Sequence, residues 1–355
     1  MKNVAILTAY LKDYVKYEFY FPSEQLLKKI FNDNDLEIHY VSPHYYDTEK
    51  KEFTQHVVIG KDDMEVVDAP YKPDLLRMRM GHALHHLEEM FEDADFLCAP
   101  TMRLKHIDSN KYQMYQYLKP YQPNSTLLST FYFYPWLQEE FTDKVVVKPI
   151  AGSGGYGIEF YTKPELTSME IFKKYAGTEG LHIVQNYQNF SKGAPGITDG
   201  NHDLRVVFLG KTPTFSIVRV PKSGSLKSNI ADGGSQFSLP IENIPTEVLE
   251  ICTLAQRDLK IDSPDIYSLD FAYCTDDAKW YLIELNSAPG IRFPDEDKHY
   301  QYKFFQDLAE YMHQLIEDNR ARSFTASLET TTASSAFLDR HTQPVKSKKK
   351  VVHKK

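Results

Sequence analysis

Cysteine is scarce in this sequence, and its three cysteines, Cys98, Cys252 and Cys274, lie far apart. They show neither the pattern of a disulfide framework nor the close spacing of a zinc site, so we expect a reducing, cytoplasmic location. Long hydrophobic runs are also missing, because no stretch approaches the roughly 18 apolar residues of a membrane helix. The apolar run near the N-terminus is interrupted by Lys12 and Asp13, which indicates a first core strand and not a signal peptide.

Most of the chain has no net positive charge, and the formal net charge of the whole sequence is −8. Residues 339–355 carry seven Lys or Arg and one Asp, a charge of +6 that leaves −14 for the rest. An acidic body argues against a nucleic-acid partner. Residues 321–355 are low in complexity and end in lysines, so we expect a disordered, solvated basic tail; contact with an anionic partner is the alternative.

The 355 residues suffice for two or three domains. Residues 1–105 alternate strand and helix patterns, which predicts an open α/β unit with a mostly parallel sheet. Ligands bind beyond the carboxyl ends of such strands, where Arg77 and Arg79 either hold an anionic substrate group or are solvated. His82, His85 and His86 have no acidic ligands nearby in a defined pattern, which favours surface residues over a metal cluster. Strands are expected at 4–9, 36–41, 57–59, 64–67, 75–80 and 95–99, and helices at 22–32 and 84–91.

A glycine-rich turn follows the β-branched run Val145–Val147 and Lys148, and an alternating strand pattern follows the turn. Its glycines allow positive φ and bring N–H groups close to an anion, while the lysine adds a point charge, which together suit a polyphosphate. The turn contains G-x-G-x-x-G, but a dinucleotide fingerprint would open a helix there. No HRD or DFG follows in order, which argues against a protein kinase. A mobile surface hairpin remains the alternative.

Other charged residues occupy positions that call for a partner. Lys111 begins a predicted helix, 111–119, where a cation is disfavoured unless an anion is nearby. Arg205 and Arg219 lie in hydrophobic strands and need a phosphate or a carboxylate. Asp270 and Glu284 lie in two apolar strands expected to pair, so something positive must separate them.

Glu284 and Asn286 are two residues apart and share a face of the predicted sheet. With Asp270 they offer hard oxygen ligands suited to Mg²⁺, which takes few carboxylates together with substrate phosphates. The alternative is a structural network with Arg205 or Arg219. Both interpretations stay open at this point.

The ordered motifs resemble the ATP-grasp superfamily, and within it the glutathione-synthetase-like and ribosomal-protein-glutamate-ligase-like branch, over roughly residues 107–316. The matching pieces are a helix-start lysine, KPIAGSGGYG, a hinge VQNY, DLR, the SN-x-x-x-GG turn, and the carboxylates followed by SAPG. The hinge has Asn186 where an acidic residue is common. The resemblance implies that ATP contacts Lys111, Lys148, Gly152, Ser153, Gly154, Gly155, Gly157, Gln185, Asn186 and Tyr187, that Asp270, Glu284 and Asn286 hold metal, and that Arg205, Arg219 and Asn229 serve the transferred group.

The resemblance further implies an α/β ATP-grasp fold with a preceding domain at 1–105, an ATP-grasp domain at 106–320 split near residue 180, and the tail at 321–355. It implies a carboxylate–amine ligase that uses ATP and two Mg²⁺ ions, with Mn²⁺ as an alternative, on small carboxylates and amines such as amino acids or peptides. No nucleic acid or membrane partner is expected. Assembly into a homodimer or a homotetramer is expected. The alternatives are a small-molecule kinase, a peptide- or protein-modifying ligase, and a non-catalytic nucleotide-binding module.

Overall fold

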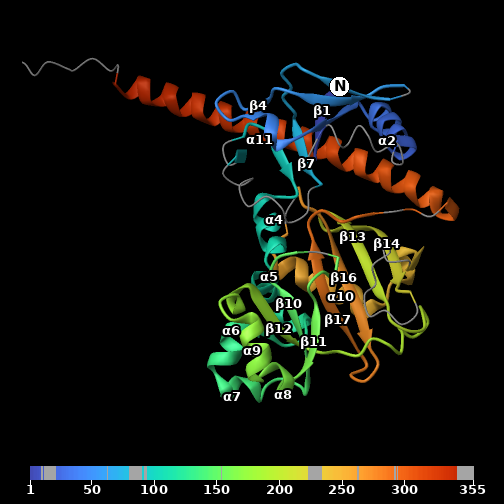
Figure 1. The fold of residues 1–355 in the computed structure, drawn as a ribbon. Helices are drawn as coiled ribbons and strands as arrows, with labels where there is room; N and C mark the ends of the chain where they lie inside the picture. Colours follow the sequence, from blue (N-terminus) through green and yellow to red (C-terminus); the bar gives the residue numbers. More distant parts are fainter. Residues whose placement is uncertain are drawn as a thin grey trace, which may run out of the picture.

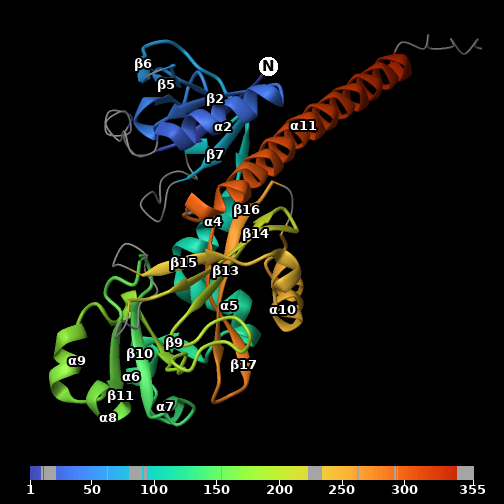
Figure 2. The ribbon, with the colours of Figure 1, turned by 90° about the vertical axis from the view of Figure 1, so that its right-hand side faces the viewer.

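Three main sheets organise the chain in the computed structural model, with the first sheet at the top of Figure 1 and the other two below it. The same order is visible from the side in Figure 2. The structure describes residues 1–8, 11, 21–61, 63–79, 90–91, 94–152, 154–222, 234–261, 264–291, 293 and 295–341.

The first sheet has six strands in the order β6-β5-β2-β1-β7-β8. Strands β2, β1, β7 and β8 are parallel, and the hairpin β5–β6 adds an antiparallel edge. Its central strand β1 is apolar on both faces because helices cover one face and an aromatic cluster covers the other. The bounds are β1 Lys2–Leu7, β2 Leu36–Val41, β5 His56–Ile59, β6 Met64–Val67, β7 Leu75–Met78 and β8 Leu97–Ala99, with helix α2 Phe21–Asp33 and the small pair β3 Tyr46–Asp47 and β4 Glu52–Phe53.

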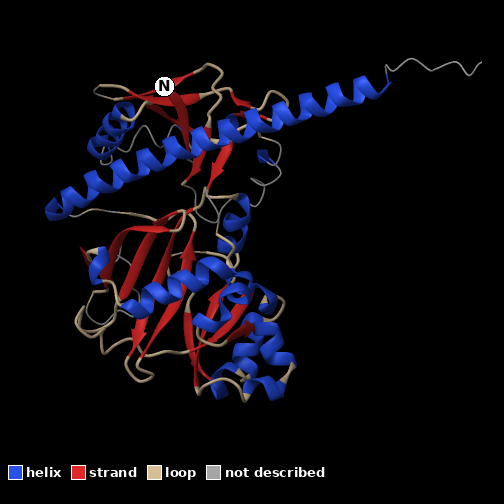
Figure 3. Cartoon of the chain, turned by 180° about the vertical axis from the view of Figure 1, so that it is seen from behind, coloured by secondary structure: helices blue, strands red, loops and turns tan. Residues whose placement is uncertain are grey.

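The long helix α11, Lys298–His341, links the first sheet to the rest of the chain. Phe304, Leu308 and Met312 lie in one core with residues of β1, α2 and the five-stranded sheet described below. Seen from behind, the helix runs along the first sheet and then projects beyond it (Figure 3). Its helical backbone continues past Arg320, where the sequence changes character, and residues 342–355 lie outside the described residues.

The second sheet has four strands in the order β11-β10-β12-β9, all pairs antiparallel. Short helices cover one of its faces, and Phe131, Phe141 and Leu166 fill the core between them and Val145 and Val147. The bounds are β9 Ser125–Leu127, β10 Lys144–Pro149, β11 Glu159–Thr162 and β12 His182–Asn186, with helices α6 Leu128–Phe133, α7 Pro135–Gln138, α8 Lys163–Leu166 and α9 Met169–Tyr175.

The third sheet has five antiparallel strands in the order β15-β14-β13-β16-β17. Strand β13 alternates its side chains: Leu204, Val206 and Phe208 pack against helix α10, and Arg205 points to the opposite face. The bounds are β13 Asp203–Leu209, β14 Thr212–Val220, β15 Ser235–Ser238, β16 Ile266–Cys274 and β17 Lys279–Asn286, with helices α4 Met102–Ser109, α5 Lys111–Leu118 and α10 Thr246–Asp258.

The predicted α/β class is confirmed, and most predicted strands are present within one or two residues. The glycine turn joins two antiparallel strands, as its sequence predicts. Two short helices, α8 and α9, follow β11, and Ser168 caps the N-terminus of α9 and separates it from α8. Helix α4 was not predicted. Predictions on His82, His85 and His86 lie outside the described residues, and among described helices none is long and apolar enough to cross a membrane.

Candidate active site

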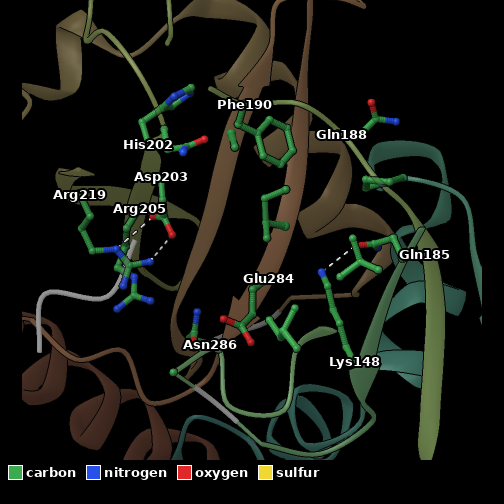
Figure 4. A pocket seen from close by; sticks show the side chains of 18 of the residues that line it. Lys148, Gln185, Gln188, Phe190, His202, Asp203, Arg205, Arg219, Glu284 and Asn286 are labelled. Carbon is green, nitrogen blue, oxygen red and sulfur yellow. Dashed lines mark hydrogen bonds and ion pairs between the residues drawn. The ribbon is translucent and has the colours of Figure 1, made fainter. Parts of the chain in front are cut away.

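A cavity of about 420 Å³ lies between the second and third sheets. That volume falls in the range typical of small-molecule sites. Figure 4 shows that Lys148 and Gln185 enter from one wall and Arg205, Arg219, Glu284 and Asn286 from the other. Apolar side chains complete the lining, namely Val146, Ile158, Phe160, Phe190, Ala272 and Ile283.

The polar residues of the third sheet form one row because of strand register. Asp203 is directly opposite Arg219, and Arg205 is directly opposite Asp270. Asp270 in turn is opposite Glu284 on β17. Side chains at directly opposed positions share a face of a sheet, so four strands deliver their charges to the same surface.

Asp270 is the centre of this row and is only 1% exposed. Arg205 makes a two-pronged contact with it, from Nε to Oδ1 at 2.8 Å and from Nη2 to Oδ2 at 2.6 Å. Arg219 Nη2 donates to Asp270 Oδ2 at 2.8 Å and to Asp203 Oδ2 at 2.5 Å. Two arginines and two aspartates thus balance one another in a buried network, which is the alternative that the sequence left open.

The two carboxylates of the network, Asp270 and Asp203, have pKa values shifted in opposite directions. Burial tends to raise the pKa of Asp270, but the charges of Arg205 and Arg219 outweigh it and leave the pKa below its usual value. Burial raises the pKa of Asp203 to about 6, against the opposing charge of Arg219. The charge of Asp270 therefore persists at neutral pH and fixes both arginines.

Lys148 faces this row from β10 on the opposite wall. Its Nζ donates to Gln185 Oε1 at 2.6 Å, and the Gln185 amide donates to Ser125 Oγ at 2.9 Å. Burial, together with the like charge of Lys111, lowers the pKa of Lys148 to about 8. A bound polyphosphate would stabilise the charged form of this buried lysine, because the anion offsets the loss of solvation that burial causes.

Lys111 and Gly152 line a smaller cavity of about 80 Å³ that shares Lys148, Gly155 and Glu284 with the larger one. Lys111 Nζ donates to the carbonyl of Gly152 at 2.5 Å and lies 3.5 Å from Glu284 Oε1. Asn110 caps the N-terminus of α5 by accepting from two backbone N–H groups, so the helix begins at Lys111 as predicted. Gly157 has φ +71, and an added Cβ would lie 2.8 Å from the Pro149 side chain, so this position requires glycine.

Glu284 and Asn286 fit a divalent cation. The Glu284 side chain is 25% exposed in the cavity, and Asn286 donates its Nδ2 to Asp270 Oδ2 at 3.1 Å, which leaves its Oδ1 as an acceptor. Among the described residues no three His, Cys, Asp or Glu side chains gather as a metal cluster. One partly exposed carboxylate, paired with Lys111 at 3.5 Å, and an amide oxygen are instead the incomplete set that Mg²⁺ takes when substrate phosphates supply the remaining ligands.

The structure brings together most of the residues that the resemblance selected, but two of them have additional roles. Gln185 holds Lys148, and Asn186 Oδ1 accepts from the backbone N–H of Thr142. Both residues still line the cavity, as Tyr187 does. Ser153 and Asn229 lie outside the described residues.

Sequence reasoning missed several lining residues, including Phe160, Phe190 and His202. Phe160 lies on β11 and follows Ile158, just before that strand, by two positions, so the alternating sequence pattern gave a usable signal for both residues. Phe190 and His202 come from the long loop after β12 and carried no periodic signal. Asp108 also lines the cavity. Only the structure indicates its role, through its hydrogen bond with Ser287.

Comparison with known proteins adds an independent observation. Residues 124–267 match the family described as prokaryotic glutathione synthetase, ATP-grasp domain. The solved structure of D-cycloserine synthetase aligns over 88% of this chain and 99% of its own, with a TM-score of 0.59 and 12% identity. The chain has the ATP-grasp fold. The cavity described above lies between two sheets of this fold.

Two curated relatives match parts of this chain. A glutathione synthetase of Prochlorococcus marinus subsp. pastoris is 29% identical over 116 residues, which is 33% of this chain and 34% of that protein. A probable alpha-L-glutamate ligase of Pectobacterium carotovorum subsp. carotovorum is 23% identical over 183 residues, 52% of this chain and 53% of that protein. The matches therefore span about a third to a half of these relatives.

Proposed function

We propose that this protein is an ATP-dependent carboxylate–amine ligase. The observation that carries the proposal is the row Arg205–Asp270–Glu284, which faces Lys148 across one cavity of an ATP-grasp fold. Cations on both walls suit a triphosphate, and a carboxylate with an amide beside it suits the Mg²⁺ that accompanies it. The names of the two relatives, a glutathione synthetase and a probable glutamate ligase, point to the same reaction class.

The proposed reaction has two steps. A carboxylate oxygen of the first substrate attacks the γ-phosphorus of ATP, and the bond to the bridging oxygen breaks to release ADP. The neutral amine of the second substrate then attacks the carbonyl carbon of the acylphosphate. Phosphate leaves, the attacking nitrogen loses a proton to it, and an amide remains. The protein forms no covalent bond, so its contribution is positioning and charge neutralisation.

Each polar wall has a part in this scheme. Lys111 and Lys148 neutralise the phosphates, and the glycine turn that Lys111 holds covers them and excludes water. Arg205 and Arg219 steady the γ-phosphate and then the acylphosphate. Because Asp270 fixes both guanidinium groups, they need little rearrangement when the charge develops.

The metal set proposed is Asp270, Glu284 and Asn286, with two Mg²⁺ ions as the full complement. When bound, Mg²⁺ neutralises phosphate oxygens and orients them for in-line transfer. Glu284 and Asn286 present oxygen atoms for this purpose, whereas Asp270 would exchange part of its arginine contact for the ion. Domain boundaries at residues 105 and 320, assembly into two or four copies, and roles for Ser153 and Asn229 also remain our proposals.

The test is ADP release from Mg·ATP with amino acids and short peptides, singly and in pairs, with mass spectrometry of the products. We expect ADP only with a carboxylate–amine pair, and a product lighter than the sum of the two by one water. ADP with a product heavier by one phosphate would contradict the ligase and indicate a kinase. ATP binding without any turnover across small and peptide substrates would contradict it as well.

A further inference from the structure

The loop of residues 187–202 joins the second sheet to the third and forms one end of the large cavity. Gln188, Phe190 and His202 line the cavity from this loop. Figure 4 shows these three side chains at one end of the cavity and Glu284 at the other. The loop therefore builds the end of the site that lies opposite the proposed metal ligands.

Strand β16 holds both ends of this loop. Near the start of the loop, the thiol of Cys274 donates to Gln188 Oε1 at 3.6 Å. At the end of the loop, the backbone N–H of Tyr273 donates to His202 Nε2 at 2.9 Å. Two adjacent residues of the strand thus bind two loop residues that are far apart in the sequence, and this closes the loop against the third sheet.

The His202 side chain takes the place of a strand partner for the Tyr273 N–H. Pairing between β13 and β16 begins with Leu204 opposite Phe271, so Tyr273 lies just beyond this ladder. The imidazole ring also lies edge-on to Trp280 of β17, with ring centroids 6.0 Å apart. His202 therefore joins the end of the loop to two strands of the third sheet.

The two hydrogen bonds of His202 define its protonation state. Nδ1 lies 3.0 Å from the carbonyl oxygen of Gly200 and must carry a hydrogen to donate to it. Nε2 accepts from Tyr273 and must carry none, so only the neutral ring protonated at Nδ1 makes both bonds. Burial lowers the pKa of His202, and the Gly200 carbonyl opposes this shift, so the ring is neutral at pH 7.

We propose that His202 is a positioning residue for the nucleoside part of ATP. The inference rests on the proposed function, which places the triphosphate and its metal beside Lys148 and Glu284. The nucleoside then extends toward the opposite end of the cavity, where Gln188 and Phe190 form the wall. His202 sets the position of this wall, because its Nε2 fixes the loop that carries both residues to β16.

Three substitutions separate the contacts of the ring. His202→Phe keeps a ring beside Trp280 and removes both hydrogen bonds. His202→Gln supplies an amide oxygen near the position of Nε2, where it can accept from the Tyr273 N–H. His202→Asn supplies an amide N–H near the position of Nδ1, where it can donate only to the Gly200 carbonyl. Because the link to β16 depends on Nε2, His202→Gln should preserve the site and the other two variants should not.

Calorimetry measures the Kd of Mg·ADP and of Mg·tripolyphosphate for the wild type and each variant. We expect His202→Phe and His202→Asn to raise the Kd of Mg·ADP about tenfold or more, the effect of one lost contact, and His202→Gln to stay within about threefold of the wild type. The Kd of tripolyphosphate should be unchanged in all three variants, because that ligand has no nucleoside. In turnover, KM for ATP should rise and kcat should be retained.

His182→Phe is the matched control. His182 Nδ1 also contacts a backbone carbonyl, that of Thr178, at 2.9 Å, and its ring also lies edge-on to an aromatic ring, that of Tyr175. His182 is outside the lining of the large cavity, so the variant should keep the wild-type Kd of Mg·ADP. Thermal melting identifies a variant that does not fold; if His202→Phe is one, the difference between His202→Asn and His202→Gln is the test.

Three results would overturn the inference while the ligase stands. One is an equal Kd of Mg·ADP in the wild type and the His202 variants. Another is a parallel loss of affinity for tripolyphosphate, which would assign the effect to the whole site. The third is a fall in kcat without a change in KM for ATP, which would assign it to the neighbouring Asp203. A wild type that binds tripolyphosphate but not Mg·ADP would contradict the proposed function itself, and this inference with it.

Discussion

Asp108 accepts two hydrogen bonds from Ser287, from the backbone N–H at 3.2 Å and from the hydroxyl at 2.5 Å. Asp108 belongs to α4, 179 positions earlier in the chain, and all but 6% of it is buried. Ser287 directly follows Asn286 and also accepts from Lys105 Nζ at 3.3 Å. The contact therefore anchors the strand end that carries the proposed metal ligands and the loop that touches Arg205.

The first prediction concerns this anchor. Asp108→Asn removes the charge that balances the buried Lys105 and weakens both contacts with Ser287. We expect kcat for ADP formation to fall about 10- to 100-fold, because small displacements of reacting groups have effects of this size. The KM for ATP should change much less, and a variant that raises only that KM would contradict a positioning role. Asp276→Asn, at a surface pair with Lys192, is the control and should retain activity.

The second prediction distinguishes the two carboxylates of the metal set. Glu284→Gln should abolish ADP release and keep the melting temperature, because Glu284 is partly exposed and contacts Lys111 at 3.5 Å. Asp270→Asn should abolish activity and also destabilise the protein by about 3–5 kcal/mol, because two buried arginines lose their counter-charge. Steady-state kinetics and chemical denaturation measure both effects. Full activity of Glu284→Gln would refute the metal assignment.

The third prediction follows from the lowered pKa of Lys148, about 8. Its positive charge is complete well below that pH and is lost above it, so affinity for ATP should fall as pH rises from 7 to 9.5. Bound phosphates favour the charged form, and ATP binding near pH 8.5 should therefore take up protons. Calorimetry in buffers of different ionisation enthalpy measures this uptake. Lys148→Ala should weaken ATP binding at pH 7 and show no such uptake; a pH-independent affinity of the wild type would contradict the assignment.

The fourth prediction concerns two histidines of the first sheet. His39 and His56 stack with ring centroids 4.8 Å apart, and their Nδ1 atoms have no hydrogen-bond partner among the described residues. Burial lowers the pKa of both histidines; Glu37 opposes the shift, and Lys28 adds to it at His39. Because the folded state resists protonation, stability should be complete above about pH 6.5 and decline below it, by at most about 1.4 kcal/mol per pH unit for each histidine.

Denaturant titrations between pH 5 and 8 measure this decline. His39→Gln should flatten the pH dependence in this window. His299→Gln replaces an exposed histidine and should leave it as in the wild type. An equally steep decline in His39→Gln would assign the effect to other groups.

The fifth prediction tests the glycine turn. Gly157→Ala forces a Cβ to 2.8 Å from the Pro149 side chain at a φ of +71, so the turn must shift. We expect kcat to fall about tenfold or more through poorer coverage of the phosphates. Gly180→Ala, where nothing lies within 4 Å of an added Cβ, is the control with wild-type rates. Equal rates in the two variants would exclude the turn from catalysis.

Local pattern was enough to predict several parts of the site. β-branched residues before Lys148 and alternation after the glycines identified two strands joined by a turn, because side-chain periodicity follows from backbone geometry alone. The same alternation placed Glu284 and Asn286 on one face. The arginines embedded in hydrophobic strands indicated that an anion had to be near.

The chain alone determined the element types, the order of the charged groups and the need to pair them. Only the tertiary structure decided which partner each charge takes: register set Arg205 against Asp270, and docking of α4 set Asp108 against Ser287. The tertiary structure also hydrogen-bonds Lys148 to Gln185 and places Arg77 and Arg79 beside the loop that follows Asn286. These contacts join residues that are far apart in the sequence. Strand pairing and packing select among possible partners of the same charge, and no local sequence pattern encodes that choice.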